Sequence, residues 1–147
     1  MTFDMNCDFI QSKFTGIKSI STDDVDIFKI QLKEIMKESE NIEGIIYIWR
    51  TITDIPRLRG KSEIIYIGRT KNSFYSRYIS KIDNEIKYFW DKYKYIVKEY
   101  GEITVDIYKT ENPEQTENNF LYQYKQEFLE LPPLNSKSYN EKLLNKF

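Results

Sequence analysis

The sequence predicts an α+β fold: a small three-stranded antiparallel sheet flanked by helices, with an additional N-terminal helix. Runs rich in isoleucine and tyrosine at residues 44–49 and 63–68, and an alternating run at 102–108, are typical of half-buried strands. Elsewhere, apolar residues recur at steps of three and four, as in helices with one buried face. We therefore expect helices to cover a short sheet.

Composition limits the kind of protein this can be. A chain of 147 residues, 40% hydrophobic and 31% charged, fits a single globular domain with one core. Cys7 is the only cysteine and there is no histidine, which excludes an internal disulfide and an ordinary structural zinc site. No apolar run approaches the roughly 20 residues of a membrane span, so we expect a cytoplasmic protein.

The N-terminal part, residues 1–41, is expected to form an arm and a helix that pack on the core. Residues 1–20 have no strong periodicity and are interpreted as an extended arm. A helix should begin at Ser21, a serine cap followed by acidic residues in the first turn. Its expected apolar positions are Ile27, Phe28, Ile30, Leu32, Ile35 and Met36.

The remaining residues, 42–147, contain two tyrosines on what is expected to be one hairpin. Tyr47 and Tyr66 lie in the first two strand-like runs, and the polar segment 50–62, with Pro56 and Gly60, is predicted to be the loop between them. A polar bend at 69–73 precedes a short helix, 74–80, that carries Arg77. Two phenols and one guanidinium should therefore converge.

Two longer helices are expected on either side of the third strand. The first should be capped by Asp83, run to about residue 99 and end at Gly101. The second should start with Asn112 as cap and Pro113 as first helical residue, and run to about residue 130. Glu117 shares its inward stripe with Leu121, Tyr124, Phe128 and Leu131. The alternative is that Glu117 only complements the helix dipole.

Charge is distributed unevenly along the chain. The net charge is −1, yet residues 50–81 carry +6, against −4 for residues 1–43 and −3 for residues 82–147. The eight cations of this segment could follow a phosphate backbone, although a solvated basic loop would have the same composition. They are Arg50, Arg57, Arg59, Lys61, Arg69, Lys71, Arg77 and Lys81.

These residues resemble the signature of the GIY-YIG nuclease superfamily over about residues 42–137. Tyr47, in the run 44–48, matches the first tyrosine, although that run has one extra isoleucine. The run 66–68 reads Tyr-Ile-Gly and matches the second signature literally. Arg77 matches the helix arginine, Glu117 the metal-binding glutamate and Asn135 the terminal asparagine. Many members carry a histidine after the arginine, where Ser80 and Lys81 stand here.

The resemblance implies a metal-dependent DNA endonuclease. Glu117 would hold one Mg²⁺ or Mn²⁺ ion, and Arg77 would bind the phosphate that is cleaved. Tyr47 would be the base, with Tyr66 orienting the water or the phosphate. A phenol has a pKa of about 10, so Arg69, Arg77, Lys71 or the metal would have to lower it.

Further residues are expected to bind nucleic acid or support the site: Gly68, Arg69, Thr70, Lys71, Lys81 and Asn135. Gly68 would allow either a close backbone approach or a positive φ. Thr70 would bind a phosphate or cap the helix of Arg77. Asn135 would tie the final loop to backbone groups near the site.

The expected partner is the phosphate backbone of DNA, with no membrane involved, and a homodimer would supply one site for each strand. Two other functions are compatible with the sequence. One is a GIY-YIG-like module without activity that binds nucleic acid or a partner. The other is an unrelated α/β interaction protein. No separate DNA-reading motif appears in the sequence, so a restriction, mobile-element, phage or repair role stays open.

Overall fold

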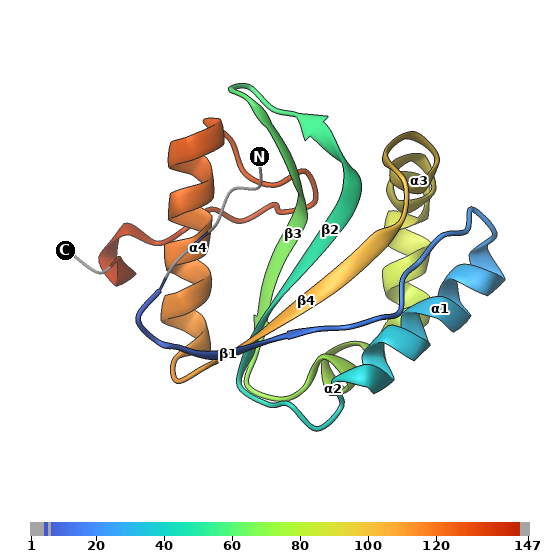
Figure 1. Ribbon diagram of the computed structural model, residues 1–147, viewed down its shortest axis with the longest axis horizontal. Coiled ribbons are helices and arrows are strands. Elements are labelled where there is room, and N and C mark those ends of the chain that lie inside the picture. The colour runs from blue at the N-terminus through green and yellow to red at the C-terminus, as the bar shows by residue number, and fades with distance from the viewer. Residues whose placement is uncertain (1–4, 6, 145–147) are drawn as a thin grey trace.

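A computed structural model of the chain describes residue 5 and residues 7–144 (Figure 1). The predicted α+β class is confirmed, but the antiparallel sheet has four strands in the order β1-β4-β2-β3. The strands are β1 (Ile10–Thr15), β2 (Ile45–Pro56), β3 (Lys61–Thr70) and β4 (Ile103–Thr110). The helices are α1 (Val25–Glu38), α2 (Phe74–Tyr78), α3 (Ile82–Tyr100) and α4 (Pro113–Phe128), followed by the 3₁₀ turn η1 (Glu141–Leu143).

The prediction of three strands was wrong because part of the expected arm is the edge strand β1, which pairs with β4. Its sequence gives little sign of this, since only Ile10 and Phe14 are partly buried and the other four residues are exposed. An edge strand with one lightly covered face lacks the clear alternation that a half-buried strand has. Residues 1–4 and 6 of the arm lie outside the described residues.

The sheet separates two hydrophobic clusters. Helices α1, α2 and α3 cover one face, and α4 covers the other (Figure 1). On the first face Tyr47 and Trp49 of β2 pack with Phe28 of α1, whereas Ile46 and Ile48 point to α4. This alternation is the period-two pattern of a strand buried on both sides. Among the described residues, no helix has both the length and the apolar character of a membrane span.

The β2–β3 hairpin is longer than predicted. We expected a loop over residues 50–62, but β2 continues to Pro56 and β3 begins at Lys61, so that only residues 57–60 connect them. The β-branched residues between Thr51 and Ile55 favour an extended chain, and Ile55 pairs with Ser62 across the hairpin. Gly60 has a φ of 71° and supplies the turn.

Two helix starts also differ from prediction. The cap of α1 is Asp24 and not Ser21, because the Asp24 carboxylate accepts hydrogen bonds from the backbone of residues 26 and 27. Ile27 and Ile30 are exposed, whereas the other four expected apolar positions are buried. Helix α3 begins at Ile82, and Asp83 binds Lys29 of α1 instead of capping. The start of α4, with Asn112 as cap and Pro113 following, is confirmed.

Tyr47 and Gly68 face each other directly across the hairpin. A Cβ atom at residue 68 would lie 2.4 Å from two ring carbons of Tyr47 and 2.5 Å from its hydroxyl oxygen. Gly68 is not among the described glycines that have a positive φ. Of the two expected roles for Gly68, close approach is therefore confirmed.

We predict that Gly68→Ala destabilises the fold by about 2 kcal/mol, since the Tyr47 ring is rigid and enclosed and must shift. Urea unfolding would measure the loss. The same substitution in a Tyr47→Leu background should cost much less, because the smaller side chain leaves room for the methyl group. Equal costs in the two backgrounds would show that the ring contact is not the cause.

Candidate functional site

The phenols of the two signature strands lie side by side on the hairpin. The rings of Tyr47 and Tyr66 stack with centroids 6.1 Å apart, and Phe74 and Tyr78 of α2 pack against Tyr47 at 5.2 and 5.6 Å. Tyr47 is only 1% exposed, and its hydroxyl oxygen lies 3.4 Å from that of Tyr78, which donates to it. Tyr66 is less buried and lines a cavity described below.

The surroundings make both phenols weaker acids. Burial raises the pKa of Tyr47, and the Tyr78 hydrogen bond and the charge of Arg77 oppose this without reversing it. Burial also raises the pKa of Tyr66, with further increases from Tyr47 and Glu117. Without a bound metal, the cations near Tyr47 do not give the lowered pKa expected of a base, because the loss of solvent outweighs the charge of Arg77.

Arg77 lies in the last turn of α2, partly exposed, with its guanidinium 5.3 Å from the centroid of the Tyr78 ring. Within the described part of the chain it has no carboxylate partner, so its donors are available to an anion. Its charge lowers the pKa of Tyr47 and Tyr66, whereas that of Glu117 raises both. The phenols thus lie within electrostatic reach of both predicted site charges.

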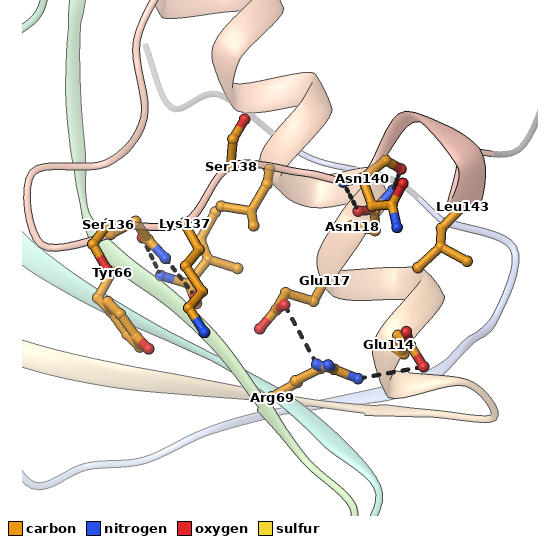
Figure 2. A pocket seen from close by; sticks show the side chains of 13 residues that line it. Tyr66, Arg69, Glu114, Glu117, Asn118, Ser136, Lys137, Ser138, Asn140 and Leu143 are labelled. Atoms are coloured by element: carbon orange, nitrogen blue, oxygen red, sulfur yellow. Dashed lines mark hydrogen bonds and ion pairs between the residues drawn. The ribbon is translucent and has the colours of Figure 1, made fainter.

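Glu117 faces a cavity of about 450 Å³ beside the edge strand β3 (Figure 2). Tyr66 and Arg69 of β3 form one side of it, Glu114 and Glu117 of α4 another, and Asn135 and the residues after it a third. Glu117 is 24% exposed, which fits the predicted inward stripe. Burial raises the pKa of Glu117 to about 7; the charge of Arg69 opposes this, and the charge of Glu114 adds a smaller increase.

The carboxylates of this cavity already attract a cation. The guanidinium of Arg69 lies between them, with Nε 3.4 Å from Glu117 and Nη1 3.6 Å from Glu114 (Figure 2). No group of three or more metal-binding side chains occurs among the described residues. A hard ion that keeps most of its waters, such as Mg²⁺, needs only one or two carboxylates. Glu117 therefore fits such an ion as a single protein ligand.

Asn135 ties the final loop to the edge strand, as predicted. Its side-chain amide donates to the carbonyl of Ile67 (2.9 Å) and its oxygen accepts from the Ile67 amide (3.0 Å). The Leu134 amide also donates to the Ile65 carbonyl. These bonds satisfy backbone groups that an edge strand would leave open, and they hold the loop against the cavity.

The other supporting residues are distributed around the bend after β3. The Thr70 hydroxyl accepts from the Asn72 amide, and the cap of α2 is Ser73, so Thr70 does not cap that helix. Lys71 lines a smaller cavity beside Thr70. Lys81 is exposed at the start of α3. None of these three lines the larger cavity.

Three of the eight basic residues of segment 50–81 have structural roles instead of facing a phosphate backbone. Arg50 is 11% exposed and binds Asp106 (2.7 Å) and Glu63 (2.9 Å). Arg57 is 9% exposed and binds Glu130, and Arg59 donates to carbonyls at the end of α4. Buried arginines need such partners, which sequence spacing alone could not reveal.

Four residues near the site were not predicted from the sequence: Tyr78, Glu85, Glu114 and Lys137. Tyr78 directly follows Arg77, and Glu114 precedes Glu117 by one helical turn, so spacing could have suggested both. Glu85 of α3 accepts a hydrogen bond from Tyr93 (3.1 Å), and its charge raises the pKa of Tyr47 and Tyr66. Lys137 lines the cavity from a loop. No sequence pattern marks either of the last two.

Comparison of the chain with protein-family models, with curated proteins and with solved structures gave no match.

We predict that Glu117→Gln stabilises the protein at pH 8 by up to about 3 kcal/mol in the absence of divalent ions. The carboxyl pKa is raised from 4.5 to about 7 on folding, so the folded state binds the proton more tightly. Stability is then lost as pH rises from about 4.5 through 7, and the neutral amide avoids that loss.

Unfolding free energies of both proteins at pH 4 and pH 8 would test this. The difference should nearly vanish at pH 4. Glu127→Gln, at an exposed position of the same helix, serves as control and should change little at either pH. A constant difference across the range would mean that burial of the Glu117 charge is not responsible.

Proposed function

We propose that this protein is a metal-dependent DNA endonuclease that hydrolyses phosphodiester bonds through a GIY-YIG-like site. The observation that carries the proposal is the gathering of the matched residues at the edge of β3. Tyr66 and Glu117 line one cavity, Tyr47 stacks on Tyr66, and Arg77 lies within electrostatic reach of both phenols. These side chains come from two strands and two helices.

In this proposal Arg77 binds the phosphate that is cleaved. A guanidinium offers planar, paired donors that match phosphate oxygens, and among the described residues Arg77 has no carboxylate partner. Charge that develops on the phosphate oxygens during hydrolysis would be stabilised there without movement of the protein.

Glu117 would hold the divalent ion, Mg²⁺ or Mn²⁺. Such an ion, when bound, supplies charge neutralisation on the phosphate and on the departing 3′ oxygen. Arg69 now contacts the Glu117 carboxylate, so it would share or yield that contact while keeping Glu114. Carboxylate binding to a cation requires the ionised form, and a pKa near 7 makes the proton readily lost at neutral pH.

The phenols would act mainly as hydrogen-bond donors, because burial keeps them protonated. Tyr66 faces the cavity and can orient a water or a phosphate oxygen. Tyr47 could take the role of base only if cations brought together in the nucleic-acid complex lowered its pKa.

The burial of Tyr47 favours a second candidate, a catalytically inactive module that binds nucleic acid or a partner through the same surface. Tyr47 is 1% exposed and its pKa is raised, and the chain has no histidine to act as base instead. A binding module needs the cations of the site but no proton acceptor.

Incubation with supercoiled plasmid in Mg²⁺ or Mn²⁺ tests the proposal. We predict nicked product from the wild-type protein and a loss of about a hundredfold to a thousandfold in rate for Arg77→Ala. Glu117→Gln should lose activity comparably, because its ion is bound weakly or not at all.

Lys37→Ala and Glu127→Gln change exposed charges on α1 and α4 and should retain the wild-type rate. Salt-sensitive DNA binding without cleavage in either ion would favour the inactive module. Full activity in Glu117→Gln would remove that residue from the reaction.

A further inference from the structure

The chain beyond Asn135 forms a wall of the cavity. Residues 136–143 run from β3 back toward α4, and five of them line the cavity, with Ser136 and Lys137 beside Tyr66 and with Asn140 and Leu143 near α4 (Figure 2). These are Ser136, Lys137, Ser138, Asn140 and Leu143. We call residues 136–138 the bridging segment, because it crosses the cavity between two fixed points.

The first fixed point is Asn135, held on Ile67 of β3. The second is Asn140, which exchanges two hydrogen bonds with Asn118 of α4. The Asn118 side-chain amide donates to the Asn140 carbonyl (2.8 Å), and its oxygen accepts from the Asn140 amide. Asn118 is 6% exposed, whereas Asn140 is exposed. The bridging segment is therefore held at both ends.

The bridging segment carries a cation into the cavity. In Figure 2 the ammonium end of Lys137 points into the space between Tyr66 and Glu117. Among the described residues, the exposed Lys137 makes no hydrogen bond or ion pair, whereas Glu117 is paired with Arg69. Of the two cations that line this cavity, Arg69 is paired with carboxylates and Lys137 is not.

We propose that Lys137 binds a phosphate of the nucleic-acid strand next to the phosphate that is cleaved, and that the bridging segment holds this strand in the cavity. This inference rests on the proposed nuclease function. A lysine ammonium has three donors on a flexible stem and suits a backbone phosphate that only needs to be held. Lys137 and Arg77 are separate cations, because Lys137 lines the cavity and Arg77 does not.

The test measures DNA binding without cleavage. A labelled DNA duplex is titrated with protein in EDTA at 50 to 300 mM salt, and log Kd is plotted against log salt concentration. Loss of one phosphate contact should reduce the slope by about 0.9. We expect this reduction, with several-fold weaker binding at the lowest salt, for Lys137→Ala, and near wild-type behaviour for Lys137→Arg.

The matched control is Lys142→Ala, because Lys142 is exposed on the same C-terminal segment but does not line the cavity. It should keep the wild-type slope. Asn118→Ala removes both bonds to Asn140 and should reproduce the loss seen in Lys137→Ala, with little further loss in the double variant. Circular dichroism would confirm that its fold is retained.

The outcomes separate this inference from the function on which it rests. Wild-type binding with equal slopes for Lys137→Ala and Lys142→Ala would overturn the role of Lys137 and leave the proposed nuclease intact. Wild-type slope and affinity in Asn118→Ala would overturn the role of the held segment. Absence of salt-dependent DNA binding by the wild-type protein would overturn both proposals.

Discussion

The packing of the Tyr47 ring on Gly68 is the contact on which the rest of the site depends. Residue 68 has no side chain, so the ring can lie across the neighbouring strand. It then forms the surface on which Tyr66, Phe74 and Tyr78 pack. Helix α2 is held against the hairpin by two of these rings, which brings its last turn, with Arg77, close to the phenols.

The same burial sets the chemistry of the site. Removal from solvent raises the pKa of both signature phenols and of Glu117, so that the phenols stay neutral while the carboxylate can change charge near neutral pH. In the proposed function, hydrogen-bond donors and an ion-binding carboxylate then lie at one edge strand. Asn135 protects that edge by bonding Ile67 and leaves the cavity open beside it.

Local sequence patterns predicted the helices and strands whose formation depends mainly on residues close together in the sequence. The strand-like runs at Tyr47, Tyr66 and residues 102–108 are strands, and Asn112 with Pro113 starts α4. Prediction was wrong where the local pattern was weak or ambiguous. Strand β1 has only two partly buried residues, and Asp24 competed with Ser21 as cap. The hairpin extends beyond its predicted length because β3 and β4 pair with residues 50, 51, 55 and 56.

The sequence by itself determined the α+β class and the excess of positive charge between residues 50 and 81, and it indicated the residues that resemble the GIY-YIG signature. Only the tertiary structure decided which basic side chains are free of carboxylate partners and so available to bind an anion. Arg50 and Arg57 are buried against acids from distant segments, whereas Lys137 enters the cavity through contacts made by Asn118 and Asn135. The physical reason is that pairing, desolvation and position depend on neighbours far along the chain, which residue spacing does not contain.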